Sequence, residues 1–280
     1  RTLCHTLPLH NPLVLAGEIA EADILTGGRL EIGVGRGHGW LYMPASIPFN
    51  ESQGRYEESM EILRRAWTEE RFSFRGEYYS VDDVQVVPKP LQRPYPPIYM
   101  TGTSGATFRI AAKNGWRICS GGPAPIDVFR DGFKAYREGC EEFGTQPHVG
   151  YVRAVFLADD EDTAHREARE AILNFYAFNV KPHDSLQGDE EIKRKLKEAG
   201  YGFYASDLLQ QMKQLSYDDI IDQEMVFVGT PQKVANQLTD LHDQWQFDEF
   251  SIVSHYGDIA PHQAYRNQEL FARRVIPAFR

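Results

Sequence analysis

The sequence predicts an α/β fold in which parallel strands and helices alternate around a single barrel. Segments with strand character and segments with helix character follow one another in turn, and such alternation implies parallel strands joined by right-handed crossovers. The chain has 280 residues, of which 42% are hydrophobic. This is enough to fill the core of one barrel, so we expect residues 1–280 to form one domain.

The first helix carries clear start and stop signals. Asn11 suits the N-cap and Pro12 the first helical position, and Gly27 can end the helix. A second helix is expected from Asn50 to Trp67, where apolar residues recur at spacings of three and four. Later helices are expected over 106–114, 126–143, 161–178 and 261–274, with one more beginning at Thr230 and Pro231.

Six strands are expected, whereas a closed barrel of this type has eight. Because the chain starts at Arg1 inside an apolar stretch, we expect that it lacks the first two strand-helix units. Residues 72–87 predict a hairpin, and the polar residues 181–224 predict an inserted lid, since they are longer than a barrel connection needs. The six strands are expected at residues 2–7, 30–35, 97–101, 116–120, 149–158 and 247–254.

Composition excludes several classes of function. A net charge of −10 argues against nucleic acid or an anionic membrane as partner. No apolar run nears 18 residues and no signal peptide is evident, so we expect a cytoplasmic protein. Three cysteines without C-x-x-C spacing suggest neither a disulfide framework nor a zinc site, and no metal is expected. The absence of a suitably spaced acid pair argues against a hydrolase.

The loop RLEIGVGRGHGW, residues 29–40, is rich in glycine and contains an arginine. The loop does not match the dinucleotide-binding motif G-x-G-x-x-G, because His38 occupies the position of the third glycine. Prolines at 44 and 48 also prevent the helix that should follow this motif. A second polar motif, TGTSGAT at 101–107, places small hydroxylated residues just before a helix, as an anion site requires.

Four stretches taken together carry a family resemblance. They are LPLHNPLVLAGEIAEADILTGGRLEIGVGRG, RYEESMEILRRAWTEERFSFRGEYY, PPIYMTGTS and VGTPQKVANQL. In this order they resemble the bacterial luciferase-like flavin monooxygenases. The resemblance implies a (β/α)8 TIM barrel with reduced flavin at the carboxyl ends of its strands, and it explains the two missing units.

The resemblance also implies which residues bind the flavin. Arg36 is expected to bind the phosphate, and Gly37 to let the backbone pass close to it. Leu3 and Cys4 fall on a bulged part of the first strand that lies against the flavin ring. A second set of phosphate contacts is implied at Gly102, Thr103, Ser104 and Thr107.

Four further residues are candidates for catalysis or substrate binding. His38 is a candidate proton donor or a solvated loop histidine, and His255 follows the last strand, where active-site residues of such barrels gather. Trp40 and Tyr42 are expected either to line the substrate pocket or to pack the loop. The family's active-site histidine has no counterpart, because its loop precedes the start of this chain.

The implied activity is a monooxygenase reaction. Reduced FMN, delivered by a separate flavin reductase, reacts with oxygen to form a C4a-peroxide that oxygenates a small organic substrate. One alternative is a deazaflavin-dependent oxidoreductase that transfers hydride, and another is a non-catalytic flavin-binding protein. The family also implies a possible homodimer.

Overall fold

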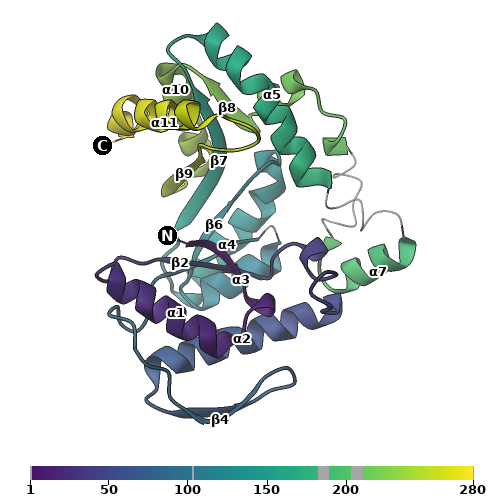
Figure 1. Ribbon diagram of the computed structural model, residues 1–280, viewed down its shortest axis with the longest axis vertical. Helices are drawn as coiled ribbons and strands as arrows, with labels where there is room; N and C mark the ends of the chain where they lie inside the picture. Colours follow the sequence, from purple (N-terminus) through teal and green to yellow (C-terminus); the bar gives the residue numbers. More distant parts are fainter. Residues whose placement is uncertain (1, 103, 182–188, 203–210, 280) are drawn as a thin grey trace. The chain divides into compact units, whose positions relative to one another are not determined.

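The structure is a computed structural model that describes residues 2–102, 104–181, 189–202 and 211–279 (Figure 1). Contacts within the chain divide it into two compact units. Unit 1 comprises residues 1–102 with 183–206, and unit 2 comprises residues 103–182 with 207–280. Among the described helices, none combines the length and apolar character needed to cross a bilayer.

Three parallel strands form the sheet of unit 1. The middle strand, β2 (Ile32–Gly35), is buried along its length and pairs with both β1 (Thr2–Thr6) and β5 (Ile98–Met100). The register of β1 against β2 shifts between Thr2 and His5, as in a bulge. The structure therefore confirms these three strands and the irregular first strand that the resemblance implied.

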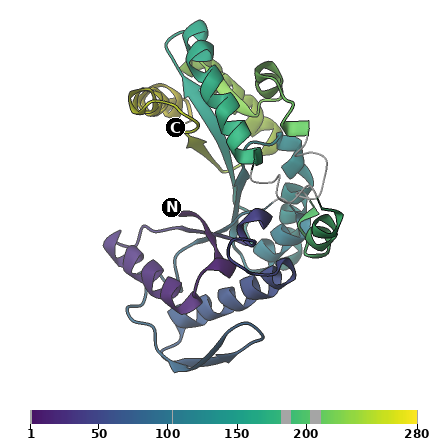
Figure 2. The ribbon, with the colours of Figure 1, turned by 45° about the vertical axis from the view of Figure 1, so that its right-hand side comes forward.

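Two helices, α1 (Pro12–Leu25) and α2 (Ser52–Thr68), pack side by side in unit 1 (Figures 1 and 2). Asn11 caps α1, because its side-chain oxygen accepts hydrogen bonds from two N–H groups of the first turn. The indole of Trp67 donates to the carbonyl of Ala16 at 3.0 Å and links the two helices. Both helices lie where the sequence predicts, although α2 begins slightly later.

The predicted hairpin is present as β3 (Phe72–Arg75) and β4 (Ser80–Val84). The Glu58 carboxylate on α2 holds its turn by accepting hydrogen bonds from the N–H groups of residues 77–79, at 2.7, 3.0 and 2.9 Å. Gly76 is required beside this contact, because a Cβ there would collide with the carboxylate. The hairpin is thus tied to α2 through one half-buried carboxylate.

Unit 2 is organised around the long strand β7 (Val149–Leu157). It pairs in parallel with β6 along residues 149–152, with β8 along 154–157 and with β9 along 150–154. The other elements of the unit are β6 (Arg117–Gly121), β8 (Val226–Gly229), β9 (Glu249–Val253), α3 (Gly105–Lys113), α4 (Arg130–Phe143), α5 (Glu161–Val180), α9 (Tyr217–Asp222), α10 (Pro231–Trp245) and α11 (Pro261–Leu270).

Most elements of unit 2 agree with the sequence, and three details differ. The helix expected from residue 126 begins as a 3₁₀ turn and becomes α-helical at Arg130. The last α-helix ends at Leu270 and continues as π and 3₁₀ turns. The sequence did not predict β8, because a buried run of four apolar residues has no period that distinguishes a strand from a helix. The parallel α/β class is confirmed.

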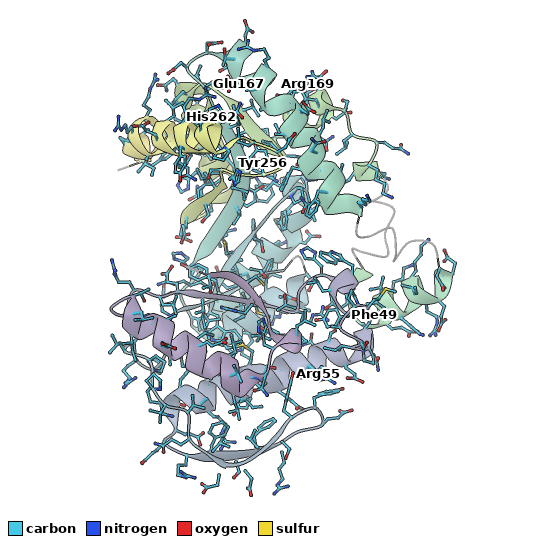
Figure 3. All side chains as sticks on the ribbon, in the orientation of Figure 1. Phe49, Arg55, Glu167, Arg169, Tyr256 and His262 are labelled. Atoms are coloured by element: carbon cyan, nitrogen blue, oxygen red, sulfur yellow. The ribbon has the colours of Figure 1, made fainter. Side chains whose placement is uncertain are left out.

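The helix α11 is joined to β7 through a buried side-chain amide. The Nδ2 of Asn267 donates to the Val155 carbonyl at 2.7 Å, and its Oδ1 accepts from the N–H of Leu157 at 3.1 Å. The amide therefore bonds the backbone of β7 as a neighbouring strand would. Arg266 of the same helix forms an ion pair with Glu167 of α5, and Figure 3 labels Glu167.

The segment 181–224 contains α7 (Glu190–Glu198) in unit 1 and α9 in unit 2. Its helical character was predicted from the sequence. Residues 182–188 and 203–210 of this segment lie outside the described residues. The lid, the two missing strand-helix units and the assignment of the whole chain to a single barrel domain stay predictions.

Candidate functional site

At the carboxyl end of the unit 1 sheet, three small residues meet. The Sγ of Cys4 on β1 lies 3.3 Å from the Oγ1 of Thr101, which follows β5. Between them, Gly35 ends β2, and a Cβ at this position would come within 2.8 Å of the Thr101 hydroxyl and 3.0 Å of the sulfur. A side chain here would push the Thr101 hydroxyl or the Cys4 thiol out of place, so Gly35 serves the protein's own packing.

Cys4 keeps a solvent-exposed face, but the protein atoms around its thiol raise the pKa, and the hydrogen bond with Thr101 only partly offsets this effect. The thiol is therefore mainly uncharged near neutral pH. This state fits a small neutral residue beside a ligand better than a nucleophile. Contact of Leu3 and Cys4 with a flavin ring stays a prediction.

The chain turns sharply after β2 at Gly37. Its φ of +79° lies in the left-handed region, and a Cβ would collide with the side chain of Thr6. The glycine therefore fixes the path of the loop on which Arg36 lies. A direct contact between Gly37 and a ligand stays a prediction.

The Arg36 guanidinium is held in a defined position. Its Nη1 donates to the carbonyl of Ala199 at 2.8 Å and its Nη2 to the carbonyl of Gly200 at 3.3 Å, both at the end of α7. The guanidinium carbon lies 4.4 Å from the ring centroid of Tyr201, in cation–π geometry. Two of the five N–H donors of the arginine are used in this way.

The loop after Arg36 packs against α7. Tyr42 is fully buried in a cluster with Leu196 and Tyr201, and its hydroxyl donates to the backbone carbonyl of Arg36. Trp40 is partly buried against the same cluster. The structure thus supports loop packing for both aromatic residues, the second of the two expected roles, and their contact with a substrate stays a prediction.

His38 is the candidate proton donor of this loop. Its ring stacks on Trp40 with the centroids 6.0 Å apart. The protein atoms around it lower the pKa, so the imidazole is neutral at physiological pH. A neutral imidazole has one donor and one acceptor nitrogen, which suits proton transfer. This catalytic role stays a prediction.

The second motif, residues 101–107, ends in the first turn of α3, and its residues from Ser104 onward belong to unit 2. Ser104 caps this helix: its Oγ accepts from the Thr107 N–H at 3.3 Å and lies 2.9 Å from the Thr107 hydroxyl. Thr103 lies outside the described residues, and Gly102 is half-buried. The hydroxyls therefore serve as a helix cap, and a joint phosphate site with Arg36 stays a prediction.

His255 follows β9 and is exposed. Its Nε2 lies 3.0 Å from the carbonyl of Ile259, and because a carbonyl only accepts, this nitrogen carries the proton. The bond closes the turn before α11. His255 thus has a structural role in the described turn, and its catalytic role stays a prediction.

Two features of the site could not be placed from local sequence patterns. His5 lies beside Cys4 on β1 and faces His10, with ring centroids 5.9 Å apart; burial and the neighbouring imidazole lower its pKa. The other feature is the end of α7, which binds Arg36. Its local signal was the glycine of EAGYG just after a helical run, but no sequence pattern links that turn to Arg36.

The fold and the site together indicate an α/β protein whose functional site lies at the carboxyl ends of parallel strands. Parallel strand-helix units present glycine, arginine and hydroxyl-bearing residues at or just after the carboxyl ends of strands, where α/β barrels carry their sites. No cluster of metal-ligating side chains occurs in the part of the chain that the structure describes.

The chain belongs to the luciferase-like monooxygenase family, whose family model matches residues 2–245. Among similar curated proteins is the FMNH2-dependent dimethylsulfone monooxygenase of Pseudomonas putida, 28% identical over 283 residues, covering 96% of this chain and 71% of that protein. The oxygenase component of the flavin-dependent trigonelline monooxygenase of Acinetobacter baylyi is 25% identical over 291 residues, with 97% and 74% covered. A shorter match of 160 residues, 30% identical, covers 55% of this chain and 47% of the F420-dependent glucose-6-phosphate dehydrogenase of Kineococcus radiotolerans.

A solved structure confirms the fold. The monooxygenase RslO1 from Streptomyces bottropensis superposes with a TM-score of 0.78 at 23% identity and covers 100% of this chain and 77% of that chain. The predicted luciferase-like barrel class is therefore correct.

Proposed function

We propose that this protein is a flavin-dependent monooxygenase that uses reduced FMN and molecular oxygen to oxygenate a small organic substrate. The observation that carries the proposal is the Arg36 guanidinium, which follows a parallel strand and is fixed by two carbonyls and an aromatic ring. Family membership and the monooxygenases among the similar proteins support the reaction class.

The residues fit a flavin phosphate. Among the described residues, the other three N–H groups of Arg36 have no protein acceptor. A planar guanidinium with free donors is suited to a bidentate contact with phosphate oxygens. Ser104 and Thr107 offer hydroxyls at the start of α3, where the helix dipole also favours an anion. The neutral thiol of Cys4 suits the uncharged face of a ring.

Reduced FMN, when bound, supplies the two electrons that activate oxygen, so that one oxygen atom enters the substrate and the other leaves as water. The protein binds the phosphate, orients the ring and keeps bulk water away. His38 and His255 are the proposed proton donors near the reacting atoms. A separate flavin reductase is the proposed source of reduced FMN, by analogy with the relative described as an oxygenase component.

The second candidate is an F420-dependent oxidoreductase that transfers hydride without oxygen. The similarity to the F420-dependent dehydrogenase favours it, although that match covers little more than half of the chain. The two candidates differ in cofactor and in their need for oxygen, so one titration separates them.

The test is an anaerobic titration with reduced FMN and with reduced F420, using Arg36→Ala and, as a matched control, the exposed helix arginine in Arg64→Ala. We expect reduced FMN to bind more tightly than F420, Arg36→Ala to weaken that binding and Arg64→Ala to leave it unchanged. Preference for F420 would favour hydride transfer. If neither cofactor binds the wild-type protein, the proposed function is wrong.

A further inference from the structure

The end of α7 has a geometry that leaves two carbonyls for Arg36. Gly200 is left-handed with φ +77°, its N–H bonds the Lys197 carbonyl at 3.0 Å, and the N–H of Tyr201 bonds the Leu196 carbonyl at 2.7 Å. This pair of bonds is a Schellman motif, which satisfies the carbonyls of Leu196 and Lys197 within the turn. The carbonyls of Ala199 and Gly200 remain, and both accept from Arg36.

The helix is anchored to the loop that carries Arg36. Leu196 is fully buried and Tyr201 nearly so, and both pack against Tyr42. Figure 3 labels Phe49, which packs against the same cluster beside α7. At the other end of α7, the Asp189 carboxylate caps the first turn. The carbonyls that face Arg36 therefore belong to a helix with both ends secured.

We propose that the C-terminal turn of α7, residues 199–201, positions Arg36 for phosphate binding, so that the docking of α7 and the binding of FMN reinforce each other. This inference rests on the proposed function of Arg36. The residues of the turn are positioning residues, because they act on the ligand only through the guanidinium.

We expect α7 and the phosphate to reinforce each other's contact with Arg36, rather than compete for it, because they use different N–H groups of the guanidinium. The two carbonyls take one N–H each, and the Tyr201 ring covers one face, so with respect to the described residues Nε and one N–H of each Nη group remain for a phosphate. A long arginine side chain loses conformational freedom when it binds an anion. The turn of α7 fixes the side chain in advance, and this loss is then smaller when the ligand arrives.

The test compares binding of FMN with binding of riboflavin, which lacks the phosphate. Two variants disturb the turn: Gly200→Ala places a Cβ in a left-handed conformation 3.4 Å from Nη2, and Tyr201→Leu removes the ring but keeps an apolar side chain. Gly202→Ala is the matched control, because a Cβ there meets nothing within 4 Å. We expect the preference for FMN over riboflavin to fall about five- to tenfold in both turn variants and to stay unchanged in the control.

Arg36→Ala separates this inference from the proposed function. If Arg36→Ala leaves the preference for FMN unchanged, the phosphate role of Arg36 is wrong. If Arg36→Ala removes the preference while both turn variants keep it, only the positioning role is wrong. In the Arg36→Ala background, Tyr201→Leu should have no further effect on the preference, because the turn acts through the guanidinium alone.

Hydrogen exchange supplies a readout that is independent of activity and of variant folding. Because coupling between two binding events is reciprocal, FMN should slow amide exchange at Gly200 and Tyr201 in the wild-type protein, and riboflavin should slow it less. Faster exchange with FMN would show that phosphate and α7 compete for Arg36. That result would overturn the proposal.

Discussion

The rate at which Cys4 reacts with an alkylating reagent tests how the residues around its thiol control the pKa. Among the cysteines, Cys4 is exposed whereas Cys119 and Cys140 are buried, so a thiol reagent should label Cys4 first. Desolvation raises the pKa of Cys4, and the Thr101 hydroxyl opposes this effect by donating to the thiolate. We expect alkylation of Cys4 to be slower at neutral pH than alkylation of a free thiol, and Thr101→Val to slow it further.

The size of the Thr101 effect follows from the hydrogen bond. Sulfur is a weak hydrogen-bonding atom and Cys4 is exposed, so this 3.3 Å contact stabilises the thiolate by about 0.5–1 kcal/mol. Since about 1.4 kcal/mol corresponds to a tenfold change, Thr101→Val should lower the rate roughly two- to fivefold at a pH below the pKa. The rate is measured with iodoacetamide as a function of pH, and mass spectrometry of the Cys4 peptide follows the label.

The control is Thr68→Val, because the Thr68 hydroxyl bonds a carbonyl of its own helix and touches no cysteine. An unchanged or faster rate in Thr101→Val would refute the account of the thiolate. The same assay tests the ring contact: saturating FMN should slow labelling of Cys4. Equal rates with and without bound FMN would contradict the placement of the flavin ring against this residue.

Three further predictions concern single groups. Replacing Glu58 with alanine leaves three backbone N–H groups of the hairpin turn without their acceptor. In urea denaturation this change should lower the free energy of unfolding by about 2–3 kcal/mol. The control Glu57→Ala, at an exposed position, should have little effect. Asn267→Ala should also lower the free energy of unfolding by about 2–3 kcal/mol, because it leaves two buried backbone groups of β7 without their side-chain partner. Gln268→Ala is the control, and an equally small change in both variants would contradict the bridging role of Asn267. In an NMR titration the pKa of His38 should lie below that of a free histidine. Because the pKa is lower in the folded than in the unfolded protein, the contribution of His38 to stability is present above the unfolded pKa. This contribution is lost as the pH falls through the folded pKa.

Local rules predicted much of this structure. Asn11 and Pro12 identified the start of α1, and Thr230 with Pro231 identified the start of α10, because capping depends on residues within one turn. The strand β8 was missed for an equally local reason: its apolar run is too short to show a period. The charged residues of 190–198 give no sign that Ile192 and Leu196 pack in a cluster, because only the tertiary fold creates that cluster.

The glycines of the β2 loop show where motif reasoning reaches its limit. The resemblance implies that Gly37 lets the backbone pass close to a ligand, which stays a prediction, and the structure shows that Gly35 and Gly37 also make room for Cys4, Thr101 and Thr6. The arrangement that fixes Arg36 comes from carbonyls more than 160 residues further along the chain. No spacing rule connects positions so distant, because a backbone carbonyl leaves no trace in residue type.

We expect the charges around Arg36 to favour a ligand with a single phosphate over one with a long acidic tail. Three of the four cations of α7 are paired within their own helix: Lys193 with Glu190, Arg194 with Glu191 and Glu198, and Lys195 with Glu191. Arg36, by contrast, has neutral carbonyls as its acceptors and no carboxylate partner among the described residues, so its positive charge is not compensated by a neighbouring anion. Because paired charges attract an additional anion weakly, we expect these three cations to add little to the attraction that Arg36 exerts on a phosphate. We therefore expect Arg36 to contribute more to the binding of a single phosphate, as in FMN, than to the binding of an extended polyanionic tail.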